Sequence, residues 1–464
     1  MQKSSILFPG LLLVLGIGLT TSVVQADPGL PGGNTTTTVQ GSNAFSQPAA
    51  NLSFDGRLDF SVGNSFFRNP WIAAPATTDA RDGLGPLFNT NSCQGCHIKD
   101  GRGHPPEEGQ SNLVSTLVRL SIPATAERPR KIHESVIAEP RYGDQAQDFA
   151  VPGITPEMRI IWNWDRVEMQ LADGEIAELR KPRLEFTDLA HGDLHPDLMY
   201  SPRVAPAMIG LGLLEAIPEE SIRAGADPDD VDDDGISGRP NEVWDQHTSS
   251  LTLGRFGWKA GKPTVEQQVA AAFFGDMGLS SSLNPGIPCS EAQTECRQAP
   301  NGGSPEVSDE TMAFVTFYSS HLAVPARPEA TDKSILAGQK LFTGSGCDSC
   351  HRPSWKTGDS ESAALANQTI YPYTDMLLHD MGEGLADNRP EFQASGREWR
   401  TAPLWGLGDY EDVNGHTQLL HDGRARNITE AILWHGGEAA DSRDNFIQLS
   451  EEKKQLLLDF LKSL

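Results

Sequence analysis

The sequence predicts a mainly α-helical protein of two repeated domains with long irregular loops, the first domain enlarged by insertions. The chain has 464 residues, which is more than one hydrophobic core usually serves. Its 45 Gly and 32 Pro residues favour loops over long regular elements. Three short segments also recur in the same order in both halves, and they are spaced more widely in the first half.

The recurring segments flank a Cys-x-x-Cys-His pentapeptide in each half. They are Gly63–Phe67 and Gly338–Phe342, Thr187–His191 and Thr374–His379, and Arg203–Gly212 and Arg400–Gly408. We therefore expect domains over residues 53–305 and 306–464. Three helix starts are predicted in the second domain, at Asp332, at Asn427 with Glu430 as a capping box, and at Ser450.

The pentapeptides Cys93–His97 and Cys347–His351 predict two covalently attached c-type haems. Two thiols add to the vinyl groups of one porphyrin, and the following His ligates its iron. The expected attachment residues and iron ligands are Cys93, Cys96 and His97 for haem 1, and Cys347, Cys350 and His351 for haem 2. A zinc site built from both motifs is the alternative, but it does not explain a His at the fifth position twice. Each domain should thus be cytochrome c-like, with a few helices wrapped around a porphyrin and little strand.

The N-terminus predicts export. Residues 1–26 have the pattern of a signal peptide, with Lys3, an apolar stretch and the small-residue site Val24-Gln25-Ala26. Residues 27–52 are rich in Gly, Thr and Ser and suggest a flexible leader. An uncleaved membrane anchor is the alternative for residues 1–26. We expect a periplasmic protein with no stable membrane insertion after cleavage.

Two further cysteines, Cys289 and Cys296, lie in a polar loop. In an oxidising compartment they should form a local disulfide. A reactive thiol pair is the alternative, although no basic cluster nearby would lower a thiol pKa.

The net charge of −26 excludes nucleic acid as a partner, because phosphate binding requires clustered Lys and Arg. A basic protein partner or a small uncharged substrate fits better. The acidic residues could equally serve only to keep an exported protein soluble.

The chain resembles the dihaem oxidoreductases often labelled peroxidases or thiol oxidoreductases, and more distantly the bacterial dihaem cytochrome c peroxidases. The closer match, from Gly63 to the C-terminus, rests on Asp82–Pro86, Cys96–Gly103, Phe256–Gly261 and Leu419–Ala425. The resemblance implies a peroxide substrate and a soluble electron-donor protein. The thiol oxidoreductase label has little support, since no thiols remain after haem attachment and the expected disulfide.

The distant resemblance covers a patch from Trp258 to Gly278. It implies that Trp258 is an electron route between the haems and that Gln268 and Asp276 line the open face of haem 1. Peroxide cleavage needs a base that takes a proton from one oxygen and returns it to the other, which a carboxylate can do. The acid is Asp here where the peroxidases have Glu, and its interval from Gln268 is shorter. The alternative is that both are ordinary polar positions near an amphipathic helix.

A second patch runs from His421 to His435. In the relatives, the sixth ligand of the C-terminal haem follows a His by fourteen residues, which here gives His435. The rivals for haem 2 are His379 and Met381. The candidates for a resting sixth ligand of haem 1 are His104, His191, His195, Met199 and Met208, although a catalytic haem would be five-coordinate or weakly blocked.

An acidic loop carries Asp230, Asp232 and Asp234 at alternate positions before Gly235. This spacing suits a short calcium loop, but the Glu of an EF-hand is missing. A solvated acidic turn is the alternative.

The functions to be weighed are an exported peroxidase, a dihaem electron carrier without a substrate site, and a haem-based oxidase of a protein or organic substrate. Trp258, Gln268 and Asp276 favour the peroxidase.

Overall fold

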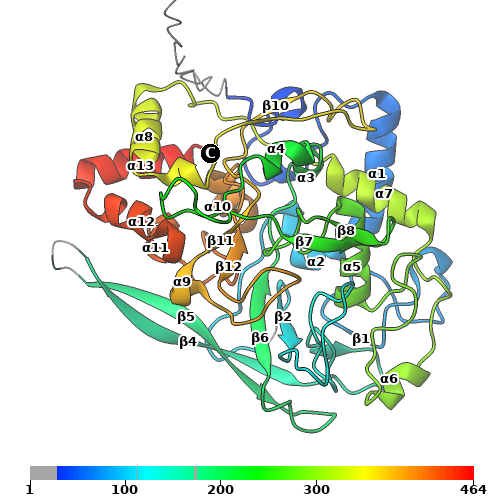
Figure 1. The fold of residues 1–464 in the computed structure, drawn as a ribbon. Coiled ribbons are helices and arrows are strands. Elements are labelled where there is room, and N and C mark those ends of the chain that lie inside the picture. The colour runs from blue at the N-terminus through cyan, green and yellow to red at the C-terminus, as the bar shows by residue number, and fades with distance from the viewer. Residues whose placement is uncertain (1–28, 112, 172–173, 175) are drawn as a thin grey trace, which may run out of the picture.

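The computed structural model describes residues 29–111, 113–171, 174 and 176–464, so the expected signal peptide lies outside the described residues. Within these ranges the chain forms thirteen α-helices and twelve strands, and the strands pair in two-stranded sheets (Figure 1). Helices form most of the packed framework, which does not conflict with the predicted mainly α-helical class. The many small sheets make the content more mixed than the sequence predicted.

Two helices far apart in the sequence pair in the first half of the molecule. α1 (Phe54–Arg68) lies against α7 (Asp309–Ser320) on the right of Figure 1. Gly63 allows the close approach, because a Cβ at this position would collide with the carbonyl oxygen of Phe314 in α7.

The second half repeats this helix pair. α8 (Lys333–Gly344) packs against α13 (Glu451–Lys462) on the left of Figure 1. Gly338 takes the part of Gly63, because a Cβ there would collide with the carbonyl oxygen of Leu456. The recurring Gly thus marks the same helix contact in both halves.

In the sequence, the remaining helices come between the two members of each pair. The first half contains α2 (Cys93–Cys96), α3 (Leu211–Glu215), α4 (Glu219–Arg223), α5 (Val265–Met277) and α6 (Thr294–Gln298). The second half contains α9 (Gly382–Leu385), α10 (Tyr410–Asn414), α11 (Ile428–Leu433) and α12 (Ala440–Ile447). The three predicted helix starts are the N-cap residues of α8, α11 and α13, and the Asn427 side chain accepts a hydrogen bond from Glu430 N.

The domain boundary expected at residue 305 does not match the packing. It would assign α7 to the C-terminal domain, whereas α7 packs on α1. Residues 324–326 also follow the N-terminal segment, because Thr37 N donates to Val324 O and Ala326 N to Thr37 O. We therefore place the boundary between α7 and α8.

Residues 29–52, expected as part of a flexible leader, belong to the folded body. Ala44 and Phe45 are fully buried, and Ala49 N donates a hydrogen bond to His321 O. The prediction of flexibility was therefore wrong for this segment. It rested on the Gly- and Thr-rich composition and gave no weight to the apolar residues Ala44 and Phe45.

The strands form six antiparallel pairs. β1 (Leu87–Phe88) pairs with β3 (Phe149–Ala150), β2 (Thr116–Ser121) with β6 (Met199–Val204), β4 (Arg159–Gln170) with β5 (Ile176–Thr187), β7 (Glu242–Asp245) with β8 (Ser250–Leu253), β9 (Trp355–Lys356) with β10 (Thr369–Ile370), and β11 (Leu378–Asp380) with β12 (Glu398–Arg400).

The long β4–β5 hairpin contradicts the expectation of little strand. It runs along the lower edge of the molecule beneath α9 (Figure 1). Hydrogen bonds from Arg180 to Arg424 O and from Arg426 to Glu178 O attach it to the second half. Alternate residues such as Ile160 and Trp162 are buried, which is the period of a half-buried strand.

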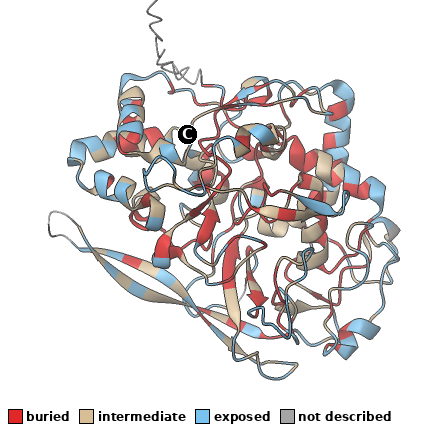
Figure 2. Ribbon diagram, in the orientation of Figure 1, coloured by how far each residue is buried: buried red, intermediate tan, exposed pale blue. Residues whose placement is uncertain are grey.

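One large core serves both halves. Its buried members include Phe67 and Phe273 from the first half and Trp399 and Trp434 from the second. Figure 2 shows the buried segments at the centre and the exposed faces on the outer helices. Among the described residues, no helix is long and apolar enough to cross a bilayer.

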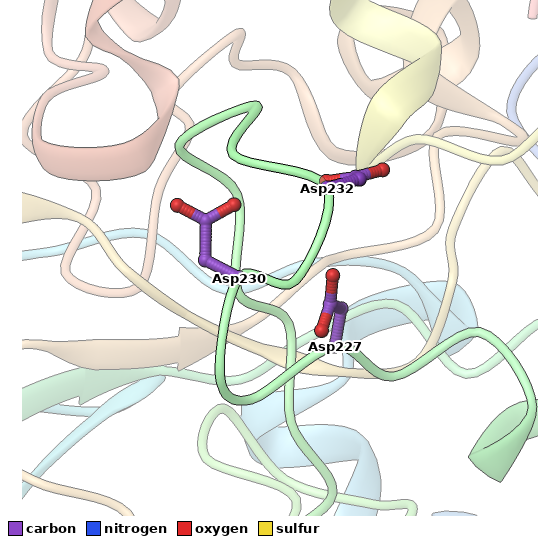
Figure 3. A group of neighbouring side chains, drawn as sticks. All are labelled: Asp227, Asp230 and Asp232. Atoms are coloured by element: carbon purple, nitrogen blue, oxygen red, sulfur yellow. The ribbon is translucent and has the colours of Figure 1, made fainter.

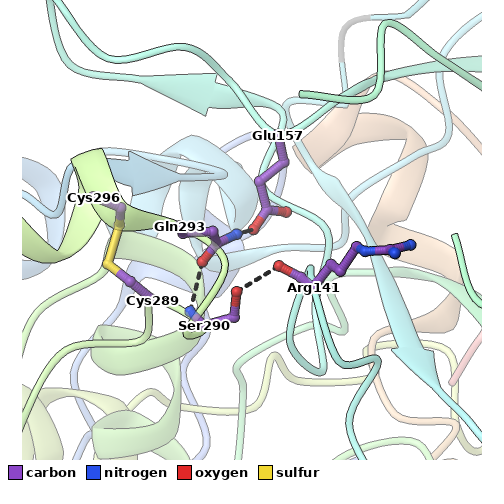
Figure 4. The surroundings of a disulfide bond; sticks show 6 residues. All are labelled: Arg141, Glu157, Cys289, Ser290, Gln293 and Cys296. Atoms are coloured by element: carbon purple, nitrogen blue, oxygen red, sulfur yellow. Dashed lines mark hydrogen bonds between the residues drawn. A yellow bond between two sulfur atoms is a disulfide. The ribbon is translucent and has the colours of Figure 1, made fainter. Parts of the chain in front are cut away.

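Cys289 and Cys296 form a disulfide, as the sequence suggested (Figure 4). The loop between them is tied to residues 141–157. Ser290 donates to the Arg141 carbonyl oxygen at 2.5 Å, and the Gln293 amide donates to Glu157. The disulfide therefore fastens an otherwise polar loop to the first half.

Candidate functional site

The first pentapeptide forms the short helix α2, followed by His97. The Nδ1 atom of His97 lies 2.8 Å from the Pro206 carbonyl oxygen. Phe67 of α1 borders the imidazole, with ring centroids 6.3 Å apart. Because a carbonyl can only accept, Nδ1 carries the proton and Nε2 keeps the lone pair that ligates a metal.

The second pentapeptide has the same surroundings. Nδ1 of His351 lies 2.9 Å from the Tyr373 carbonyl oxygen, and Phe342 of α8 lies with its ring centroid 6.3 Å from the imidazole. Burial lowers the pKa of both His97 and His351 to about 4, so both imidazoles are neutral at neutral pH. The two His residues are therefore suited to ligate iron.

The zinc alternative has no site in the part of the chain that the structure describes. No group of three or more His, Cys, Asp or Glu side chains close enough to share a metal includes a residue of either pentapeptide.

An apolar cavity lies over the second pentapeptide. Cys347, Cys350 and His351 line it together with His435, which follows α11. Nδ1 of His435 lies 2.7 Å from the Ala431 carbonyl oxygen, so Nε2 again keeps its lone pair.

The two imidazoles in this cavity are spaced as opposite ligands of one metal. The ring centroids of His351 and His435 are 6.5 Å apart. A metal bound at about 2 Å by one nitrogen of each ring would place the centroids roughly 6 Å apart. The residues present therefore fit a haem with two axial His ligands.

His379, a rival for this position, also lines the cavity and lies 3.6 Å from Cys350 Sγ, but both of its ring nitrogens face carboxylates. Its Nδ1 lies 2.7 Å from Glu438 Oε2, and its Nε2 lies 2.7 Å from Asp375 Oδ2. Burial alone would lower the pKa of His379, but these carboxylates raise it well above its usual range. His379 is thus a cation without a free ring nitrogen, while Met381 borders the same cavity as His435.

Trp258 lines the second candidate site and is linked to the first through the backbone of residues 204–206. Its ring borders the cavity of the second site. Its indole N–H donates to the Val204 carbonyl oxygen at 2.9 Å, and Val204 lies two residues before Pro206, which holds His97.

Asp276 lies at the end of α5 beside the first pentapeptide. Its backbone carbonyl accepts hydrogen bonds from Asn89 N and Thr90 N, just before α2. Burial, followed by the charge of Asp276, raises the pKa of the Cys96 thiol. Burial also raises the pKa of Asp276 itself.

Gln268 lies two turns before Asp276 on the same helix and is half-buried. Gln145 contacts Asp276 directly instead, since its Nε2 donates to Asp276 Oδ1 at 2.9 Å. Gln145, Asn89, Asp148 and Arg119 around Asp276 were missed from the sequence, because they lie in loops and short strands without a motif.

The candidates for a sixth ligand of haem 1 are scattered. His104 is exposed, and the His191 ring is tilted against that of Tyr142, with ring centroids 5.7 Å apart. The backbone of His195 binds Glu139, Met199 begins β6, and Met208 N donates to the Asp100 carbonyl. None of these contacts joins one of the five side chains to His97, so the resting sixth ligand of haem 1 stays a prediction.

The acidic loop brings together a different set of carboxylates from the predicted one. Oxygens of Asp227, Asp230 and Asp232 lie within 4.8 Å of one another (Figure 3). Asp234 instead accepts a hydrogen bond from Ile236 N at 2.8 Å. Calcium binding here stays a prediction, with Asp227 in place of Asp234.

Comparison with known proteins supports the haem interpretation. A family model described as "Di-haem oxidoreductase, putative peroxidase" matches residues 25–464. No curated protein and no solved structure matches the chain. The chain therefore belongs to the di-haem oxidoreductase family.

Proposed function

We propose that the protein is an exported dihaem c-type cytochrome that reduces hydrogen peroxide at haem 1 with electrons delivered through haem 2. The observation that carries this proposal is the asymmetry of the two sites. His351 faces a second imidazole, that of His435, whereas the first pentapeptide lies beside the half-buried Asp276, whose carboxyl pKa is raised by desolvation. One site suits electron transfer and the other suits acid–base chemistry.

The side chains around the first site have distinct roles in this proposal. When bound, the haems supply the iron and the electrons for peroxide cleavage. Asp276 takes a proton from one peroxide oxygen and returns it to the other, which leaves as water. Gln145 donates a hydrogen bond to Asp276 Oδ1, so that Oδ2 is the oxygen that accepts and returns the proton. Gln268 orients the peroxide, and Trp258 connects the two sites.

Export and the electron donor are part of the same proposal. The signal-like N-terminus, the c-type haem motifs and the disulfide all suit a periplasmic protein. The net charge of −26 would attract a soluble donor protein with a basic docking face.

The proposal is tested by electron paramagnetic resonance of the oxidised and half-reduced protein together with peroxide consumption. We expect one low-spin iron and one that is high-spin or becomes so on half-reduction, with peroxide consumed at the expense of reduced donor. Two low-spin irons in every redox state, and no peroxide consumption above that of free haem c, would instead identify an electron carrier.

Loss of one attachment thiol should remove one haem. Cys96→Ala and Cys350→Ala should each prevent correct attachment at one pentapeptide, because a thioether to one vinyl group is lost. The mass of the matured protein measures this. Replacing Cys289 and Cys296 by Ser is the matched control and should leave both haems bound. A wild-type protein that contains zinc and no porphyrin would contradict the haem assignment.

His435→Ala should convert one low-spin iron to high-spin and leave the other iron unchanged. The expectation rests on the spacing of the His351 and His435 rings. Electron paramagnetic resonance measures the change, and Met381→Leu, in the same cavity, is a control that should keep the low-spin signal. The same conversion in His379→Ala, with His435→Ala unchanged, would show that the ligand is misassigned.

A further inference from the structure

A hydrogen-bonded chain joins Asp276 to a second carboxyl group, that of Asp148. Gln145 Nε2 donates to Asp276 Oδ1 at 2.9 Å and to Asn89 Oδ1 at 2.6 Å. Asn89 Nδ2 then donates to Asp148 Oδ1 at 3.1 Å. Two amides therefore fix one oxygen of each carboxyl group.

The backbone builds this chain next to the first pentapeptide. In the β1–β3 pair, Phe88 is opposite Phe149, so Asn89 and Asp148 meet where the pair ends. Asn89 is also four residues before Cys93 and binds the carbonyl oxygen of Asp276 through its own N–H. The charge of Asp148, like that of Asp276, contributes to the raised pKa of the Cys96 thiol, for which burial is the main cause.

The second oxygen of Asp148 is placed to hold a proton. Asp148 Oδ2 is buried and has no hydrogen-bond partner among the described residues. A buried ionised oxygen without a donor is costly, and protonation removes that charge. Burial raises the pKa of Asp148 to about 6, against hydrogen bonds from the Asn89 side chain and from the backbone N–H groups of Asp148 and Leu113, which favour the ionised form.

Peroxide reduction requires more protons than Asp276 alone can hold. When Asp276 moves a proton from one oxygen of hydrogen peroxide to the other, that other oxygen leaves as water. The remaining oxygen needs two protons and two electrons to become a second water, and the electrons come from the donor protein through the haems. One carboxyl group can supply only one of these protons before it is recharged.

We propose that Asp148 is the second proton-supplying carboxyl group of the first site. One proton leaves Asp148 Oδ2 and ends on the oxygen that remains after the first water has left. The second proton that this oxygen needs, and the proton that restores Asp148, both come from solvent, so Asp148 is unchanged over a turnover. This inference rests on the proposed peroxidase function. It makes Asp148 and Asp276 a pair whose spacing is set by Asn89 and Gln145.

Asp148→Asn tests the proposal, because it keeps the shape and the acceptor for Asn89 but holds no exchangeable acidic proton. We expect kcat with hydrogen peroxide to fall by about tenfold to a hundredfold with little change in KM, within the range of general acid catalysis. Wild-type activity should decline as the pH rises through about 6, where Asp148 loses its proton. This limb of the pH profile should be absent from Asp148→Asn and return in Asp148→Glu.

A second readout does not depend on turnover. Infrared spectra of the holoprotein at pH 5 should contain a carboxylic acid C=O band that Asp148→Asn lacks and that wild type loses on titration to pH 8. Asp197→Asn, which removes an exposed carboxyl group in the same half, should keep both the band and the activity. The visible spectrum confirms in each variant that both haems are bound.

The outcomes separate this inference from the proposed function. The role of Asp148 would be wrong if the Asp148→Asn variant kept the turnover and the pH profile of the wild type, or kept the infrared band. The proposed peroxidase function would not be affected by that result. A wild-type protein that does not reduce peroxide would overturn both. Loss of the band and of the pH limb, with Asp197→Asn unaffected, is the result we expect.

Discussion

Asp276→Asn is expected to keep both haems and the fold but to lower turnover with hydrogen peroxide by roughly two to four powers of ten. The amide is nearly isosteric with the carboxyl group, and its oxygen can still accept the hydrogen bond from Gln145. It can neither take a proton from peroxide nor return one. Steady-state kinetics with a reduced donor measure the loss, and electron paramagnetic resonance shows whether both irons are unchanged.

Gln268→Ala is the matched comparison on the same helix. It should cost less, because an amide that orients peroxide transfers no proton. Wild-type turnover in Asp276→Asn would remove this residue as the acid–base group while leaving the peroxidase assignment intact.

Lys259→Met should lower the free energy of unfolding by about 3–5 kcal/mol, the usual cost of breaking a buried ion pair. Lys259 Nζ is fully buried, 3.0 Å from Asp387 Oδ1 and 2.7 Å from the Ser395 carbonyl oxygen. Lys259 belongs to the first half and its partners to the second. Without it, the buried carboxylate of Asp387 keeps the Arg203 guanidinium at 3.8 Å and a hydrogen bond from the backbone N–H of Arg389 at 3.0 Å.

Denaturant unfolding of the holoprotein measures this change. Arg166→Met is the control, because Arg166 pairs with Glu178 on the exposed hairpin and should contribute less than about 1 kcal/mol. Equal unfolding free energies in the two variants would show that Arg203 alone neutralises Asp387.

The parts of the site that the sequence predicted are those fixed by local spacing. A pentapeptide places two thiols and a His on one turn, so His97 and His351 could be named without a fold. The fourteen-residue interval from His421 to His435 came from the resemblance to the relatives, and the role of His435 as an iron ligand stays a prediction. The residues that the structure adds at the first site, Gln145 and Asp148, come from a loop and meet Asp276 only through tertiary pairing.

Long-range packing explains the errors in the fold. The boundary at residue 305 followed the repeat order, but α7 pairs with α1 across more than two hundred residues, which no local pattern reveals. The β4–β5 hairpin could have been predicted from the sequence, since Trp162 and Trp164 alternate with the polar residues Asn163 and Asp165. The Gly-rich composition of residues 29–52 predicted a flexible segment. The buried side chain of Phe45 instead packs this segment into the core.

The three residues Val204, Ala205 and Pro206 join the two candidate haem sites through the backbone. Val204 N donates to the carbonyl oxygen of His421 in the second cavity, while Pro206 O accepts a hydrogen bond from His97. We therefore expect a ligand at haem 1 that shifts this stretch to alter the reduction potential of haem 2. Reduction of haem 2 must then change the affinity of haem 1 for that ligand by the same coupling free energy, so a potential shift and an affinity ratio measured separately should agree.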